Sequence, residues 1–172
     1  MMYLESDCIE KDIASQFHDL AVAYLESAER LCREMVDGTW SPSFNNGQGC
    51  LWLAFHATEL FLKGCIRSVS PERLRNIHSL GEIQVTFSSL FPTVKFESPF
   101  GPEPISPQPV LMDLALKADA TLHHQLRYPV DTSGTPWGGI RVFVPELFLA
   151  EIERLRSDFD RVSSIVRSKS DG

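Results

Sequence analysis

The chain has 172 residues, of which 43% are hydrophobic and 23% are charged, a composition that is typical of one globular domain and excludes a disordered chain. Its formal net charge is −7 and its sequence pI is about 5.2. RNA is therefore a disfavoured partner, because affinity for phosphates comes from clustered Lys and Arg.

The first residues of the chain and the spacing of its cysteines indicate in which cellular compartment the protein is expected. Glu5, Asp7 and Glu10 interrupt the start, so no signal peptide is predicted, and the longest apolar stretch carries charged side chains that rule out a membrane span. None of the four cysteines lies in a CxxC pair, which argues against a zinc ribbon or a thioredoxin-type site. We expect a cytoplasmic protein with free thiols and no membrane association.

The first predicted helix spans Ile9 to Val36, with Gly38 as its stop signal and a loop from Thr39 to Gly49 after it. Apolar residues within it step by three and four along the sequence. They predict a buried stripe made of Ile13, Phe17, Leu20, Tyr24, Ala28, Leu31 and Met35.

The second predicted helix, roughly Gln48 to Arg67, is apolar in every direction around its axis. Such a helix is buried on most sides, so we expect it to be the central helix of a bundle. His56, Glu59 and Lys63 nevertheless fall at positions i, i+3 and i+7, and they therefore share one face of this helix.

Short elements and a long loop follow. Pro71 is expected to open a short turn or helix capped by Ser70, and the third helix should span Leu80 to Leu90 with Ser79 as its cap. The repeated prolines between Pro92 and Pro109 predict a long loop without helix.

Two further helices complete the prediction. A fourth spans about Val110 to Leu126, and an irregular stretch from Arg127 to Pro145 follows, in which Ile140 to Val144 favours a short strand or hairpin arm. The last helix starts at Pro145, frays from Ser168 and buries the stripe Phe148, Ile152, Leu155, Phe159, Val162 and Val166. Together these elements predict a single all-α domain, residues 1–172, folded as an up-and-down bundle of four to five helices.

The polar face of the central helix supports two interpretations. Ionised groups on a buried helix must be paired and hydrogen-bonded, because their desolvation is otherwise costly. His56, Glu59 and Lys63 are therefore either a buried ion-pair group that fixes the register of the helix, or a ligand-binding or catalytic face.

Candidate partners for that face cluster at the end of the fourth helix: His123, His124, Arg127, Tyr128 and Asp131. His78, directly before the third helix, is either a further candidate or a helix-entry contact. No HxxxH or HExxH spacing and no glycine-rich phosphate-binding motif occurs, so we expect neither a metal nor a cofactor.

Three patches of the sequence resemble the HEPN superfamily: Phe55 to Gly64 (FHATELFLKG), Ile77 to Leu80 (IHSL) and Leu126 to Pro129 (LRYP). The resemblance implies a HEPN-like bundle of four or five helices that is often a homodimer. It also implies roles that range from metal-independent endoribonuclease, in toxin–antitoxin and phage-defence systems, to nucleotide-binding or purely structural modules.

The nuclease members of that superfamily carry an Arg followed by a His in a late helix. Here no histidine follows Arg127, and the formal match from Arg73 to His78 falls before the third helix. We therefore expect a non-catalytic HEPN-like module, in a defence or toxin–antitoxin setting, that binds a small ligand, a nucleotide or a partner protein. The alternative is an endoribonuclease that uses Arg127 with His123 or His124. The expected ligand-binding residues are His56, Glu59, Lys63, His78, Arg127, Tyr128 and Asp131.

Overall fold

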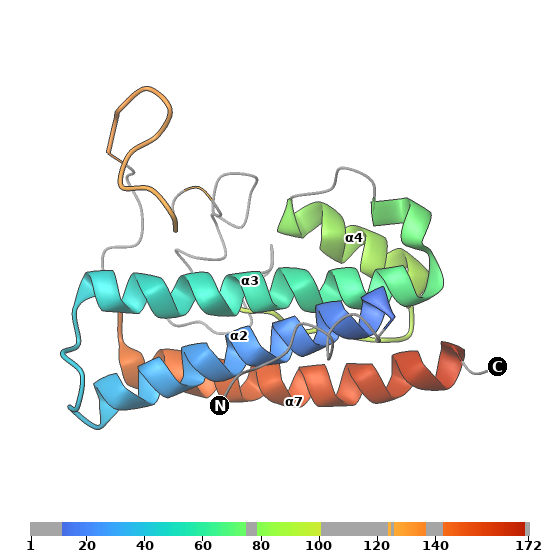
Figure 1. The fold of residues 1–172 in the computed structure, drawn as a ribbon, viewed down its shortest axis with the longest axis horizontal. Helices are drawn as coiled ribbons and strands as arrows, with labels where there is room; N and C mark the ends of the chain where they lie inside the picture. Colours follow the sequence, from blue (N-terminus) through green and yellow to red (C-terminus); the bar gives the residue numbers. More distant parts are fainter. Residues whose placement is uncertain (1–11, 75–78, 101–123, 125, 137–142, 171–172) are drawn as a thin grey trace.

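The computed structural model describes residues 12–74, 79–100, 124, 126–136 and 143–170. Three long helices lie side by side: α2 (Ile13–Val36), α3 (Phe44–Val69) and α7 (Pro145–Ser170). The short helix α4 (Leu80–Leu90) and the 3-10 helix η1 (Pro71–Leu74) pack on α3 (Figure 1). The prediction of an all-α bundle is thereby confirmed.

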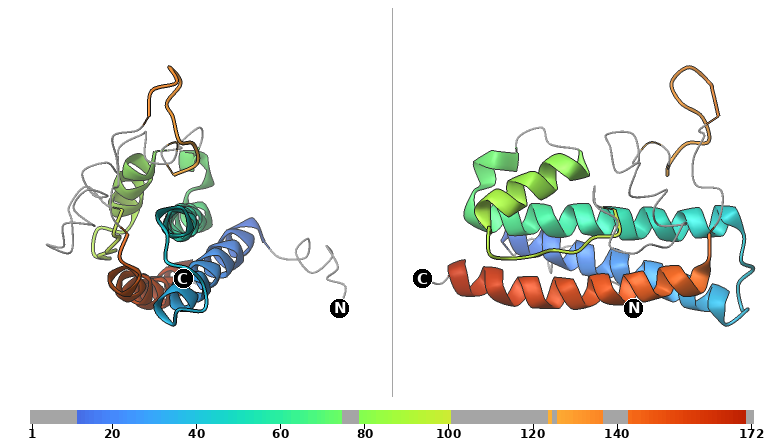
Figure 2. Two further views of the ribbon diagram at one scale, coloured as in Figure 1. Left: turned by 90° about the vertical axis from the view of Figure 1, so that its left-hand side faces the viewer. Right: turned by 180° about the vertical axis from the view of Figure 1, so that it is seen from behind.

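Helix α3 is the central element, as predicted. Seen end-on, it is surrounded by α2, α4 and α7 (Figure 2), and it contacts all three of them. Phe61 of α3 stacks on Phe159 of α7, with ring centroids 3.9 Å apart and an interplanar angle of 7°. Both rings are almost fully buried, so this stack is the middle of the core.

Side-chain caps decide where the helices begin. The Asp12 carboxylate accepts from the Ser15 backbone N–H at 3.0 Å, so α2 begins at Ile13 and the predicted start at Ile9 is wrong. Ser43 accepts from the Asn46 backbone N–H at 3.2 Å, so α3 begins at Phe44, four residues before the predicted Gln48. The predicted loop from Thr39 to Gly49 therefore ends early.

Gly47 explains why a sequence that looks like a loop continues as helix. A Cβ placed on Gly47 would lie 2.3 Å from Cγ of Phe143, so only glycine lets that ring pack against the first turn of α3. The Asn-Asn-Gly run is thus a helix start that receives an aromatic side chain, and the usual turn meaning of these residues is overridden.

The buried stripe of α2 differs from the predicted one. Ile13 and Leu20 are about half exposed, at 49% and 51%. Compared with the predicted stripe, the buried positions Ala21, Leu25 and Cys32 each lie one residue further along the sequence. Gly64 of α3 lets α2 pack closely against α3, since a Cβ on Gly64 would lie 3.1 Å from Cβ of Phe17. The buried residues of α2 are Ala21, Leu25, Ala28, Cys32 and Met35.

The predicted bounds of the two short helices and of the last helix agree largely with the structure. Helix α4 has the predicted bounds, with Ser79 as its cap, and Pro71 opens a short helix as expected. Helix α7 starts at Pro145 as predicted and buries every residue of its predicted stripe, but it continues to Ser170 where fraying was expected from Ser168.

Some predictions fall on parts of the chain that are not described. Most of the fourth helix, the second half of the proline-rich loop, and residues 140–142 of the possible strand lie outside the described residues. Phe143 and Val144, which are described, are not in a strand. An antiparallel bridge between Val130 and Pro136 is present in the irregular stretch before α7. None of the described helices combines the length and apolarity that crossing a membrane requires.

Candidate functional site

The polar face of α3 is a connected group in the structure. Lys63 Nζ donates to Glu59 Oε1 at 2.6 Å, and His56 Nδ1 lies 3.4 Å from Glu59 Oε2. The three side chains are mostly buried, with exposed fractions of 23% for His56, 13% for Glu59 and 15% for Lys63. The helical spacing i, i+3, i+7 is what brings them together.

Glu59 is held as a carboxylate. Burial acts to raise its pKa, but the neighbouring His56 and the hydrogen bond and charge of Lys63 outweigh that effect and lower the pKa to about 2. Glu59 therefore gives the site a negative charge at neutral pH.

His56 is packed between two aromatic rings. Its ring makes edge-on contacts with Tyr24 of α2, at a centroid distance of 5.1 Å, and with Trp52 of α3, at 4.5 Å. The Nδ1 atom is buried, and its orientation toward Glu59 does not meet the geometry of a hydrogen bond, so it lacks a hydrogen-bond partner among the described residues. A buried polar atom without a partner is costly and marks a place where a ligand atom or a water can bond.

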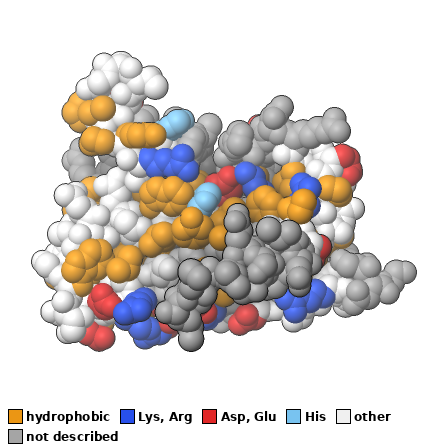
Figure 3. All heavy atoms as spheres, in the orientation of Figure 1, with side chains coloured by type: hydrophobic (Ala, Val, Ile, Leu, Met, Phe, Trp, Pro, Cys, Tyr) orange, Lys and Arg blue, Asp and Glu red, His pale blue; other side chains and the backbone are white. Residues whose placement is uncertain are grey.

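Arg127 reaches the same face from a distant part of the sequence. Its guanidinium carbon lies 4.8 Å from the centroid of the Trp52 ring, a cation–π contact. Together with Phe55 and Leu126, these residues line a cavity of about 390 Å³ that also contains His56, Glu59 and Lys63. The space-filling view of this face shows a histidine, acidic and basic side chains in a row among hydrophobic ones (Figure 3).

Three other predicted site residues that the structure describes, His124, Tyr128 and Asp131, do not line this cavity. Tyr128 is 54% exposed, and its ring lies beside that of His124 at a centroid distance of 6.4 Å. The Asp131 carboxylate accepts from the backbone N–H groups of Ser133 and Thr135 at 2.8 and 2.9 Å, so it organises its own turn. A hydrogen bond from the Ser133 hydroxyl, together with these backbone hydrogen bonds, lowers the pKa of Asp131. His78 and His123 lie outside the described residues.

Two aromatic residues of the site, Trp52 and Tyr24, were not predicted from the sequence, whose pattern places both among ordinary core positions. Trp52 nevertheless stands one helical turn before His56 and therefore belongs to the same face, so its i, i+4 spacing carried a usable signal. No such signal existed for Tyr24, because its contact with His56 depends on how α2 crosses α3.

The described residues show no group of three or more His, Cys, Asp or Glu side chains that could hold a metal ion. Cys32, Cys50 and Cys65 are free and buried, and burial raises the pKa of each thiol to about 12. These thiols are therefore inert core residues rather than nucleophiles.

Comparison of the chain with protein-family models, with curated proteins and with solved structures gives no match.

Proposed function

We propose that this chain is a HEPN-like helical module that binds a mononucleotide, without catalysing a reaction on it, in the cavity formed by α3 and Arg127. The observation that carries the proposal is the convergence of Lys63 and Arg127 with the buried Glu59 carboxylate and the Trp52 ring around one cavity of about 390 Å³. This volume falls within the usual range of small-molecule sites.

The chemistry of the cavity suits the parts of a nucleotide. The cations of Lys63 and Arg127 outnumber the single carboxylate of Glu59, so the site favours an anionic group such as a phosphate. Glu59, being ionised, can accept hydrogen bonds from ribose hydroxyls or an exocyclic amine. The buried Nδ1 of His56 offers one further hydrogen-bonding position.

Arg127 supplies the matched test, because it is exposed and its loss leaves the core intact. Titration calorimetry should detect binding of adenosine or guanosine monophosphate, and Arg127→Gln should weaken it about tenfold or more, since a hydrogen bond to a charged group is lost. Arg30→Gln is the control, because Arg30 is 82% exposed and pairs only with Glu34 among the described residues. Absence of binding at millimolar nucleotide, or equal affinity in Arg127→Gln, contradicts the proposal.

The proposal also includes a homodimer in a reducing cytoplasm. The buried free thiols of Cys32, Cys50 and Cys65 are compatible with a reducing compartment. The apolar stripe of α7 is buried inside the bundle, so a dimer must form through other surfaces. The exposed side chains of Ile13 and Leu20 on α2 are candidates for such a surface. Light scattering at micromolar concentration tests this part, and a monomeric mass contradicts it.

A partner protein is the second candidate ligand of the same face. Tyr128 and Val130, at 54% and 39% exposure, form an apolar edge on the segment that also carries Arg127.

A metal-independent endoribonuclease is the catalytic alternative, in the defence or toxin–antitoxin setting that the resemblance implies. In its favour, Arg127 and His124 stand within one turn, where the Arg127 backbone N–H donates to the His124 carbonyl at 3.0 Å. An Arg can stabilise charge on a reacting phosphate and a His can move a proton. Cleavage of total RNA that is lost in both Arg127→Gln and His124→Ala supports this alternative and overturns the non-catalytic proposal.

A further inference from the structure

The cavity at Glu59 is lined by a row of side chains along one face of α3. Trp52, His56, Glu59 and Lys63 follow one another in this row at intervals of three or four residues. Arg127 lies over Trp52, at the end of the row that is furthest from Lys63. Since a helix rises about 1.5 Å per residue, the step from Trp52 to Glu59 separates the two ends of the cavity by roughly 10 Å along the axis. A ligand that contacts both Arg127 and Glu59 must therefore be elongated.

The Glu59 carboxylate retains acceptor positions for a ligand. Each carboxylate oxygen has two lone pairs, and Lys63 Nζ occupies one position on Oε1 at 2.6 Å. His56 Nδ1 lies 3.4 Å from Oε2 without the geometry of a hydrogen bond. Because the carboxylate is ionised at neutral pH, both of its oxygens accept hydrogen bonds and neither donates one.

This acceptor pair distinguishes between the nucleobases. Guanine presents two neighbouring donors on one edge, its N1–H and its exocyclic amine, and a carboxylate can accept from both in parallel. Adenine and cytosine present a donor beside a ring nitrogen that is itself an acceptor, and uracil presents a single N–H between two carbonyl groups. A bidentate pair with an ionised partner is stronger and more specific in geometry than a single neutral hydrogen bond. The Glu59 carboxylate is therefore most complementary to guanine.

Arg127 is suited to the other end of a nucleotide. Its guanidinium carbon lies 4.8 Å from the centroid of the Trp52 ring, and this cation–π contact uses the ring and not a hydrogen-bond acceptor. No carboxylate among the described residues forms an ion pair with Arg127. Its N–H donors are therefore available for the oxygens of a phosphate.

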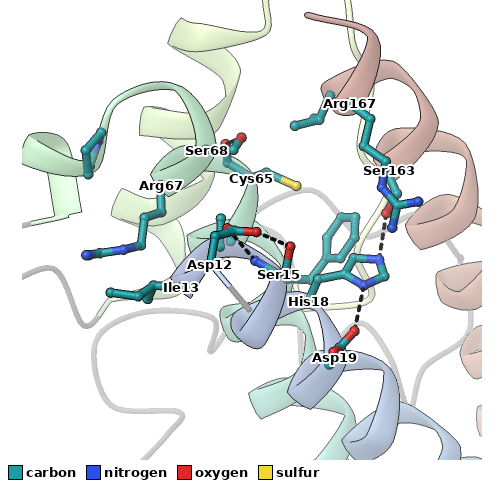
Figure 4. Close-up of a pocket in the computed structure, with 15 residues that line it drawn as sticks. Asp12, Ile13, Ser15, His18, Asp19, Cys65, Arg67, Ser68, Ser163 and Arg167 are labelled. Carbon is teal, nitrogen blue, oxygen red and sulfur yellow. Dashed lines mark hydrogen bonds and ion pairs between the residues drawn. The ribbon is translucent and has the colours of Figure 1, made fainter. Parts of the chain in front are cut away.

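A larger cavity, of about 1000 Å³, lies where the first turns of α2 meet the C-terminal parts of α3 and α7 (Figure 4). Its arginines, Arg67 and Arg167, lie on opposite sides of it with Asp12 between them. Its carboxylates, Asp12 and Asp19, are exposed, so water competes with a ligand for them more than at the mostly buried Glu59. The two cavities share no lining residue, so the larger one supplies a control position.

We propose that the cavity at Glu59 selects guanine, an inference that rests on the proposed mononucleotide site. Glu59 accepts from N1–H and from the exocyclic amine of the base, and Arg127 binds the phosphate. Lys63 holds the carboxylate in place through its hydrogen bond to Oε1. The order of these groups along α3 gives the nucleotide one direction, with its base at Glu59 and its phosphate at Trp52 and Arg127.

Calorimetric titration of the wild-type chain with three nucleotides tests the selection without any variant. Guanosine monophosphate should bind at least about tenfold more tightly than adenosine monophosphate, because adenine places an acceptor against the carboxylate. Inosine monophosphate, which keeps N1–H and lacks the exocyclic amine, should bind with intermediate affinity. Equal affinities, or tighter binding of adenosine monophosphate, overturn the selection of guanine and leave mononucleotide binding in place. No binding of any of the three overturns both.

Variants assign the selection to Glu59. Glu59→Gln replaces one acceptor oxygen by a donor, so the ratio of the affinities for guanosine and adenosine monophosphate should fall toward one. Arg127→Gln should weaken both nucleotides by the same factor, because its contact is with the phosphate. Arg67→Gln is the control, since Arg67 lines only the larger cavity. An unchanged preference for guanosine monophosphate in Glu59→Gln with native circular dichroism, or a loss of binding in Arg67→Gln, overturns the inference.

Discussion

The two faces of α3 illustrate different ways of using one helix. On one face, Phe61 stacks on Phe159 inside a closed aromatic core, and every contact contributes to folding. On the other face, Glu59 and Lys63 form an ion pair beside a cavity, and the buried His56 Nδ1 has no hydrogen-bond partner among the described residues. The first face maximises stability, whereas the second keeps polar groups in a costly environment, which we attribute to ligand binding.

The largest expected effect is on the aromatic face. Phe61→Ala removes a ring that is 1% exposed and leaves a cavity against Phe159, so it should lower the free energy of unfolding by about 3–5 kcal/mol. Urea denaturation followed by circular dichroism measures the loss. Phe44→Ala is the matched control, since Phe44 is 42% exposed and its loss should cost far less. Equal losses in the two variants contradict the assignment of Phe61 to the centre of the core.

The next effect concerns the first turn of α3. Gly47→Ala forces a Cβ into the Phe143 ring, so we expect a loss of about 1–3 kcal/mol in spite of the better helix propensity of alanine. Thermal unfolding measures it. Combining Gly47→Ala with Phe143→Ala should cost less than the two single changes added together, and strict additivity rules out the proposed clash.

The third prediction concerns how the contribution of Glu59 to the free energy of unfolding depends on pH. The folded pKa of Glu59 is lowered to about 2 from an ordinary value of 4.5, so its contribution to stability is fully present above pH 4.5. That contribution is lost as the pH falls from 4.5 toward 2. The difference in free energy of unfolding between wild type and Glu59→Gln should therefore shrink over this range. A difference that does not change with pH means that the Glu59 carboxylate is not stabilised by Lys63 and its neighbours.

The smallest expected effect is at a helix cap. Ser43→Ala removes the acceptor for the Asn46 backbone N–H and should cost about 1 kcal/mol. Ser41→Ala serves as the control, because the Asn46 side chain bonds to the backbone carbonyl of Ser41 and not to its hydroxyl. A cost in Ser41→Ala that matches the cost in Ser43→Ala contradicts the cap.

Local patterns predicted much of the fold. The stripe of α7, the cap of α4 at Ser79 and the central position of α3 all follow from periodicity and capping, which depend on neighbours in the sequence. The predicted start of α3 was wrong, and the predicted stripe of α2 was wrong at Ile13 and Leu20 but right at Ala28 and Met35. Both errors arise because these features depend on distant contacts. One is the Phe143 ring on Gly47, and the other is the approach of α2 at Gly64.

The candidate site was predictable only in part. Helical spacing placed His56, Glu59 and Lys63 on one face, and this arrangement is present in the structure. The position of Arg127 over Trp52 depends on the path of the chain after α4, which periodicity cannot supply. Asp131 was grouped with the site because it is close to Arg127 in sequence, but its carboxylate closes a turn.

Replacing Glu59 and Lys63 together with methionine tests whether the polar face of α3 binds a ligand rather than stabilises the fold. Replacing a buried ion pair by apolar residues is often neutral or stabilising, so the double variant should unfold at the same or higher urea concentration than the wild type. Calorimetric titration with adenosine and guanosine monophosphate should show binding to the wild type and none to the double variant. A double variant that is strongly destabilised, together with a wild type that binds neither nucleotide, would instead make the pair of Glu59 and Lys63 a structural element.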